Sequence, residues 1–195
     1  MLRSRVPVAV GLALGTGILL HLHYEVLLFL LVQGASIYDL SSIARRVDSV
    51  GRAALLLATG ISVIVSNLLL LLLYWRSSST LIEIVTLTQV SDILQYLGGN
   101  LVGRTRIGSI SPKKTYEGYL VSLALILTGS WILDLSMGRV VIYWSLGVTG
   151  GLVNSLIKRS FDLKDFSDLL GDHGGWLDRS DSIYLPGFFA YFLQW

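Results

Sequence analysis

Long apolar stretches alternate with short charged loops along the whole chain. The clearest stretch, residues 53–75, runs for 23 residues without a charged side chain. Residues 140–157 and 118–133 are also free of charge and are bounded on both sides by charged residues. A helix needs about 20 mostly apolar residues to cross about 30 Å of hydrocarbon. Each of these three stretches therefore predicts a membrane-spanning helix.

Three further stretches are less regular. Residues 81–102 are long enough to span a membrane, although Asp92 lies near their middle. Residues 6–38 are too long for one helix and contain polar residues up to Glu25, so we expect two short spans there. The apolar, aromatic tail over 183–195 is short and predicts a half-span or an interfacial helix. Together these stretches predict about six or seven spans.

The composition supports a membrane protein. Of the 195 residues 53% are apolar and only 14% are charged, whereas about a quarter are charged in a typical soluble domain. The formal net charge of +2 is too small to favour a nucleic-acid partner, and the lack of cysteine excludes a disulfide scaffold. We expect an all-α polytopic helix bundle, compact overall. We expect residues 1–80 to form N-terminal membrane helices without a motif, and residues 81–195 to form the membrane domain that carries the chemistry considered below.

The basic residues predict which way the spans face. If the N-terminus is cytosolic, thirteen of the fifteen Lys and Arg residues fall in cytosolic segments, and only Arg76 and Arg139 fall outside. Cytoplasmic loops carry an excess of Lys and Arg. The two polar loops, 103–116 and 158–181, are therefore expected on the cytosolic side of a multi-pass protein of the cytoplasmic membrane.

The loop over residues 158–181 is the strongest candidate for chemistry. It holds ten charged residues, four basic and six acidic, and every acidic one is Asp. Short carboxylates beside basic residues suit Mg²⁺ with phosphate, because the ion takes one or two carboxylates and shares its other positions with phosphate oxygens. Gly174 and Gly175 would let backbone N–H groups approach an anion. The alternative is a solvated loop with surface ion pairs.

Two other features allow a functional and a structural interpretation. The loop over 103–115 has four basic residues among glycines and hydroxyls, which suits a polyphosphate and equally suits anchoring to anionic lipid headgroups. Asp92 is an acid inside an apolar stretch, which is by default a functional hypothesis. Ser91, Gln95 and Tyr96 lie near it on a helix and predict a polar face.

Three ordered blocks between residues 89 and 182 carry a family resemblance. The first is Ser91-Asp92 with Tyr96 and Gly99. The second is Ser111-Pro112-Lys113-Lys114-Thr115-Tyr116-Glu117-Gly118. The third runs through Ser155, Lys158-Arg159, Lys164-Asp165, His173-Gly174-Gly175 and Asp178-Arg179 to Asp181. In order and spacing they resemble the phosphatidate cytidylyltransferases, or CDP-diacylglycerol synthases.

The resemblance implies a membrane nucleotidyltransferase of phospholipid biosynthesis. Such an enzyme joins CTP and phosphatidate into CDP-diacylglycerol and pyrophosphate, with Mg²⁺ as cofactor. Its partners would be these two substrates and membrane lipid, without nucleic acid, and a homodimer is compatible with the sequence.

The resemblance also implies roles for individual residues. The catalytic candidates are Lys158, Asp178 and Asp165. The metal candidates are Asp178, Asp181, Asp92 and Asp172. The substrate-binding candidates are Ser111, Lys113, Lys114, Thr115, Arg159, Lys164, His173, Gly174, Gly175 and Arg179.

The chain departs from the family pattern at four positions. Gly151 stands where members usually carry an Asp expected to help bind metal, and Asn154 stands where an acid is common. Gly171 and Asp172 replace a Pro-Gly pair, so Asp172 is a candidate substitute carboxylate.

Two alternatives stay open besides this reading. One is a cytidylyltransferase for another lipid phosphate, such as a prenyl-ether analogue, because an apolar acyl-chain groove has no motif. The other is a non-catalytic lipid-binding paralogue, which the absence of Asp at 151 favours. A transporter is a third alternative, because Asp92 within a span could line a path. The concentration of charge on one side and the absence of a repeat between the two halves argue against it.

Overall fold

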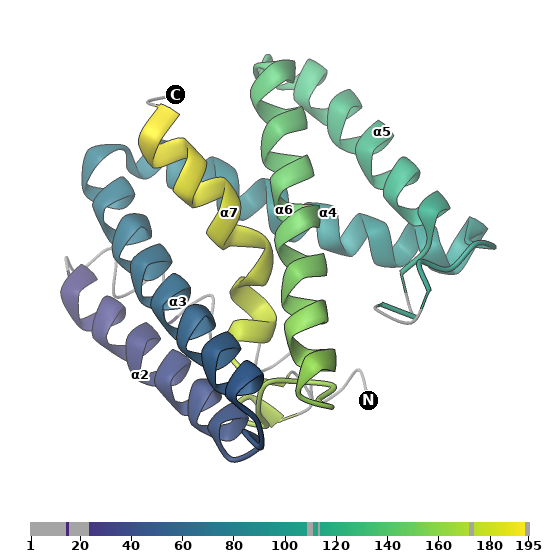
Figure 1. Ribbon diagram of the computed structural model, residues 1–195. Coiled ribbons are helices and arrows are strands. Elements are labelled where there is room, and N and C mark those ends of the chain that lie inside the picture. Colours follow the sequence, from purple (N-terminus) through teal and green to yellow (C-terminus); the bar gives the residue numbers. More distant parts are fainter. Residues whose placement is uncertain (1–14, 16–23, 109–110, 113, 172–173, 194–195) are drawn as a thin grey trace. The chain divides into compact units, whose positions relative to one another are not determined.

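The computed structural model describes residue 15 and residues 24–108, 111–112, 114–171 and 174–193. Six long helices follow one another in this part of the chain (Figure 1). They are α2 (Glu25–Ala44), α3 (Val50–Arg76), α4 (Ser78–Val102), α5 (Tyr116–Ile132), α6 (Met137–Ser160) and α7 (Leu177–Leu193). The prediction of an all-α membrane protein is confirmed.

Three of these helices, α2, α3 and α6, are long and apolar enough to cross a membrane. Their surfaces keep many large apolar side chains exposed, among them Leu57 and Ile61 of α3. Soluble monomers rarely expose large contiguous apolar patches, so these surfaces suit contact with lipid. The expected count of six or seven spans stays a prediction, and the first of them, before Glu25, lies outside the described residues.

Several predicted boundaries were wrong. Helix α2 begins at Glu25, as the sequence indicated, but it ends at Ala44 rather than at residue 38. Asp39, which follows the predicted stretch over residues 6–38, is therefore part of a helix. The polar loop is likewise shorter than 158–181, because α6 continues through Ser160 and α7 begins at Leu177. The C-terminal helix starts well before residue 183 and includes Pro186.

The chain divides into two units. Unit 1 comprises Met1–Leu71 and Ile157–Ser180, and unit 2 comprises Leu72–Leu156 and Asp181–Trp195. The predicted division into residues 1–80 and 81–195 was based on where the motifs lie, which is a different criterion, and it stays a prediction.

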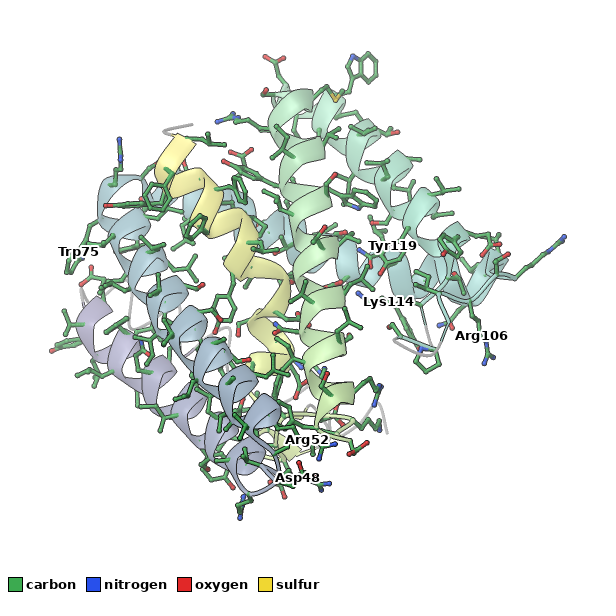
Figure 2. The ribbon with its side chains drawn as sticks, in the orientation of Figure 1. Asp48, Arg52, Trp75, Arg106, Lys114 and Tyr119 are labelled. Atoms are coloured by element: carbon green, nitrogen blue, oxygen red, sulfur yellow. The ribbon has the colours of Figure 1, made fainter. Side chains whose placement is uncertain are left out.

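In unit 1, polar contacts join α2 to α3 and to the loop over residues 161–176. The buried Asn67 of α3 donates from Nδ2 to Oγ of Ser36 at 3.2 Å. Arg52, in the first turn of α3, binds Asp48 at 3.0 Å and Asp162 of the loop at 2.7 Å; Figure 2 labels Arg52 and Asp48. The start of α3 is therefore tied to the loop that carries the third motif block.

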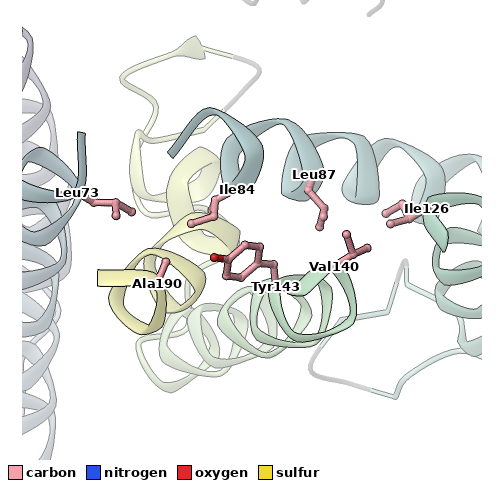
Figure 3. Packing of buried hydrophobic residues seen from close by; sticks show 7 residues of the cluster. All are labelled: Leu73, Ile84, Leu87, Ile126, Val140, Tyr143 and Ala190. Atoms are coloured by element: carbon pink, nitrogen blue, oxygen red, sulfur yellow. The ribbon is translucent and has the colours of Figure 1, made fainter. Parts of the chain in front are cut away.

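Unit 2 has an apolar core to which α4, α5, α6 and α7 contribute, together with the end of α3. Its buried members are Leu73, Ile84, Leu87, Ile126, Val140, Tyr143 and Ala190 (Figure 3). Helices α4 and α5 approach closely where Gly118 faces the α4 backbone, because a Cβ there would lie 2.6 Å from the carbonyl oxygen of Gln95. This close approach brings the second motif block, at the start of α5, against the first block on α4.

Candidate functional site

In unit 1, the centre of the third motif block is a buried ion pair. Nζ of Lys158, at the end of α6, lies 2.6 Å from Oδ1 of Asp178, in the first turn of α7. The two side chains are only 11% and 4% exposed. The other carboxylate oxygen of Asp178 accepts backbone N–H groups from Phe166 at 2.8 Å and Gly175 at 2.9 Å. Asp178 therefore organises the loop over 161–176 as well as pairing with the lysine.

The two motif glycines face two different carboxylates. Gly174 has φ +79°, and a Cβ there would lie 2.8 Å from Oδ2 of Asp178. A Cβ on Gly175 would lie 2.4–2.7 Å from the carboxylate of Asp39. Contacts below 3.0 Å do not fit a side chain, so both positions require glycine for packing.

Asp39 is a residue that the sequence analysis missed. It is fully buried, and its carboxylate accepts the hydroxyl of Ser167 at 2.5 Å and the N–H of Leu177 at 2.8 Å. A neighbouring hydroxyl on α2, that of Ser42, donates to the carbonyl of Phe166. The only sequence signal was a carboxylate directly after the apolar stretch over residues 6–38. Because the predicted span ended at residue 38, Asp39 was not recognised as part of a helix.

In unit 2, Lys114 occupies the centre of a second polar cluster. Its Nζ lies 3.4 Å from Oδ1 of Asp92 and 3.3 Å from Oε1 of Gln95, both on α4. It also lies 5.7 Å from the centre of the Tyr119 ring, and Figure 2 shows the two side chains close together. The first and second motif blocks therefore meet at one ammonium group.

Behind Lys114 a chain of hydrogen bonds runs between the helices of unit 2. Nε2 of Gln95 donates to Ser91 at 2.7 Å, and the hydroxyls of Ser91 and Ser122 are 3.1 Å apart. The indole N–H of Trp144, on α6, donates to Ser122 at 3.3 Å. The predicted polar face thus includes Ser91 and Gln95, whereas Tyr96 is 67% exposed and points elsewhere.

The loop before α5 is held by hydrogen bonds within its backbone and to Glu117, in the first turn of α5. Its backbone pairs Ile107 N–H with the Lys114 carbonyl at 3.0 Å, and the carboxylate of Glu117 accepts the N–H groups of Arg104 and Thr105 at 3.1 Å. Hydrogen bonds from the backbone N–H of Glu117 itself, from the side chain and backbone of Thr105 and from the backbone of Arg104 lower the pKa of Glu117 to about 2. Glu117 therefore stays ionised and holds the loop that carries Lys114.

Burial opposes the charge on Lys114, but the nearby acids prevail. Desolvation lowers the pKa of the ammonium, while Asp92, Tyr119 and Asp181 raise it, and the net result is a pKa above the usual value. Lys114 is therefore a permanent cation at neutral pH.

Position 151 opens onto this cluster. A Cβ on Gly151 would lie 3.6 Å from Nζ of Lys114 and 3.8 Å from Oδ2 of Asp181, which are ordinary contacts. At Gly150 a Cβ would instead lie 2.6 Å from the Asp181 carbonyl. Packing therefore requires glycine at 150, whereas at 151 there is room for a side chain directed toward Lys114 and Asp181.

The remaining predicted residues have diverse surroundings. Lys164 is 75% exposed and lies 3.9 Å from the carboxylate of Asp165. Arg159 donates to the Leu163 carbonyl at 2.8 Å, and the Thr115 hydroxyl accepts the Gly118 N–H at 3.1 Å as the N-cap of α5. Ser111 is half-buried and Arg179 is exposed. Lys113, Asp172 and His173 lie outside the described residues.

The described residues contain no group of three or more His, Asp or Glu side chains close enough to hold a metal ion. In unit 2, the carboxylates that could donate to Mg²⁺ are those of Asp92, which lies 3.4 Å from Nζ of Lys114, and Asp181, whose Oδ2 borders the position of Gly151. Two carboxylates match the usual protein share of a Mg²⁺ coordination sphere. Asp178 fits less well, because Lys158 and two N–H groups already bind its oxygens.

Comparison with known proteins matches almost the whole chain to one family. Residues 6–195 match the profile of the cytidylyltransferase family. Phosphatidate cytidylyltransferase 5 of Arabidopsis thaliana chloroplasts is 39% identical over 111 residues, which cover 52% of this chain and 28% of the relative. Phosphatidate cytidylyltransferases of Synechocystis and Bacillus subtilis are 35% and 37% identical over 112 and 114 residues. Those matches cover 52% and 53% of this chain, and 38% and 42% of the relatives.

Proposed function

We propose that this chain, which belongs to the cytidylyltransferase family, transfers the cytidylyl group of CTP to phosphatidate. The products would be CDP-diacylglycerol and pyrophosphate. The family resemblance of the three motif blocks is confirmed by the match over residues 6–195. The activity itself is a proposal, because the chain spans only 28–42% of the length of the relatives described above.

The observation that carries the proposal is that, within unit 2, one carboxylate from the first motif block and one from the third lie close to Lys114 of the second. The first block contributes Asp92, the second contributes Lys114, and the third contributes Asp181. A half-buried cation among carboxylates, next to an open position at Gly151, is a suitable place to bind a phosphate group together with a divalent ion.

The proposed reaction joins two anions. A phosphate oxygen of phosphatidate attacks the α-phosphorus of CTP, the bond from that phosphorus to the bridging oxygen breaks, and pyrophosphate leaves. Such a reaction depends on positioning and on neutralisation of charge. We assign Lys114 to a substrate phosphate, because its ammonium is charged and reaches the interior from a loop.

The other groups support this arrangement. Mg²⁺, which we expect as cofactor, would be held by Asp92 and Asp181 and would neutralise phosphate charge when bound. In unit 1, Lys158 pairs with Asp178, and Asp178 also accepts the N–H of Gly175. We therefore assign Lys158 a structural role, that of fixing the carboxylate that holds the glycine turn. We further propose catalytic roles for Lys158, Asp178 and Asp165, and contacts of Arg159, Lys164 and Arg179 with substrate phosphates.

The protein is a membrane protein, and its orientation is part of the proposal. We place the loops over 103–115 and 161–176 in the cytosol, because CTP is a cytosolic, membrane-impermeant substrate and the basic residues favour that side. The cytoplasmic membrane and a homodimer stay predictions.

The test is synthesis of CDP-diacylglycerol by the purified chain in detergent with CTP, phosphatidate and Mg²⁺. Lys114→Met, which keeps the length of the side chain and removes its charge, should lower kcat/KM about ten- to a hundredfold, as expected for a charged hydrogen bond. Arg45→Met, an equally basic but exposed position, should stay within about twofold of the parent. Equal losses in both variants would mean that the loop only anchors the protein to anionic lipid.

A non-catalytic lipid-binding protein is the second candidate, and the absence of a carboxylate at Gly151 favours it. A folded protein that binds phosphatidate and releases no pyrophosphate would support that candidate. Activity with a prenyl-ether phosphate and none with phosphatidate would instead support a related lipid substrate.

A further inference from the structure

Asp39 is a buried acid in a helix that carries no family motif. Asp39 is 0% exposed, and it lies in α2, one of the helices apolar enough to span a membrane. A carboxylate in such a place is costly unless donors satisfy it. Its donors come from far along the chain, at Ser167 and Leu177.

The second of these bonds acts directly on the third motif block. Leu177 is the first residue of α7, and the first N–H groups of a helix have no partner within the helix. Oδ2 of Asp39 supplies that partner at 2.8 Å. The next residue is Asp178, so the bond fixes the point from which the Asp178 side chain projects toward Lys158.

The glycine turn is held between the two acids. Gly175 packs against the carboxylate of Asp39, and its N–H donates to Asp178. Gly174 packs against Asp178 from the other side of the turn. The turn therefore takes its shape from two carboxylates, only one of which belongs to the motif.

Phe166 makes a parallel link. Its carbonyl accepts the hydroxyl of Ser42, one turn along α2 from Asp39, and its N–H donates to Asp178. Its buried ring lies 5.4 Å from Nζ of Lys158. Helix α2 thus binds two backbone groups next to Asp178 in the structure, the N–H of Leu177 and the carbonyl of Phe166.

We propose that Asp39 is a positioning residue, which holds the glycine turn and Asp178 in the geometry that the cytidylyltransferase reaction requires. The inference rests on the proposed function for its kinetic consequence. The mechanical part, that Asp39 immobilises the loop over 161–176, can be measured without any activity.

The kinetic test compares Asp39→Asn with Asp48→Asn in the purified protein. Asparagine keeps the shape of Asp39 but has one acceptor oxygen for two donors, so the loop loses one anchor. We expect kcat to fall about ten- to a hundredfold, the scale of a misplaced catalytic group, with the KM for CTP changed less than about threefold. Asp48, which is exposed and pairs with Arg52, should have little effect.

A second variant guards against misfolding. Ser167→Ala removes one hydrogen bond from Asp39 and leaves the bond to Leu177 in place. It should fold and show a smaller fall in kcat in the same direction. A monodisperse Asp39→Asn protein with kcat within twofold of the parent would overturn the proposal, and so would an unaffected kcat in Ser167→Ala if Asp39→Asn does not fold.

The mechanical test uses a spin label at Asp168→Cys, an exposed position of the loop in a chain without native cysteine. Asp39→Asn should increase the mobility of the label, and Asp48→Asn should not. If the parent makes no CDP-diacylglycerol but the label still responds, the proposed function fails and the anchoring by Asp39 stands. If the label is equally mobile in both variants, the anchoring is wrong whatever the activity.

Discussion

Nζ of Lys158 lies 2.6 Å from Oδ1 of Asp178 in an ion pair that is almost closed to solvent. Removing one partner of a buried pair leaves an uncompensated charge, which typically costs about 3–5 kcal/mol. Lys158→Met and Asp178→Asn should each lower the free energy of unfolding by that order, and the double variant should lose less than the sum of the two. Denaturant unfolding in detergent measures all three.

The exposed pair Arg52–Asp48 is the matched control for this effect. The Asp48 side chain is 68% exposed, and exposed pairs contribute about 0–1 kcal/mol. Asp48→Asn should therefore hardly change the stability. Equal effects at the two pairs would show that Lys158 and Asp178 are solvated in the protein.

The open position at Gly151 gives a gain-of-function prediction. Gly151→Asp would place a carboxylate next to Lys114 and Asp181, where there is room for it. With a further oxygen ligand available, we expect the Mg²⁺ concentration for half-maximal activity to fall, and a Mg²⁺ titration of product formation measures this. Gly151→Asn has nearly the same size without the charge and should not lower the requirement; if it does so equally, the carboxylate is not a ligand.

Glu117 predicts a dependence of stability on pH. Hydrogen bonds from its own backbone N–H and from Thr105 and Arg104 hold its pKa at about 2, below its ordinary value of 4.5. A depressed pKa in the folded state stabilises the fold above the unfolded pKa, and this contribution is lost as the pH falls from about 4.5 toward 2.

The measurement is the difference in Tm between the parent and Glu117→Gln. The parent should be the more stable at pH 7, and the difference should shrink as the pH is lowered from 4.5 to 3. A difference that is the same at pH 7 and pH 3 would mean that the ionised carboxylate is not what holds the loop.

Cysteine labelling in intact cells tests the orientation. Cysteines placed at Ser49, Arg106 and Asp168, all exposed, should be shielded from an impermeant thiol reagent, and one at Ser79, near the start of α4, should react. Because the chain has no native cysteine, the background is clean. Labelling of the first three and not of Ser79 would invert the topology and place the loops on the wrong side for CTP.

The sequence predicted the helical class and the three motif blocks because both depend on local patterns. An apolar stretch identifies its own helix, and Lys158 with Asp178 falls within one block. Asp39 could not be found this way, since its partners Ser167 and Leu177 lie more than a hundred positions away and no motif surrounds it.

The same limit explains the residues whose surroundings differ from expectation. Thr115 and Arg159 belong to motif blocks, yet their polar groups bind the backbone at Gly118 and Leu163. These hydrogen bonds join residues only three or four positions apart. A family motif shows which residues are present but not whether their side chains bind the local backbone or a substrate. Glu117 likewise received no separate role from the sequence, whereas its carboxylate binds the backbone of the loop that carries Lys114.

The most direct test of the proposed reaction follows the phosphorus atoms of CTP. The purified chain is supplied with phosphatidate, Mg²⁺ and CTP labelled either at the α- or at the γ-phosphorus, and lipid and aqueous products are counted separately. Cytidylyl transfer predicts that the α-label enters the lipid fraction and that the γ-label is released as pyrophosphate in equal amount. Transfer of the γ-label to lipid, or no label in lipid from either nucleotide, would contradict the proposed function.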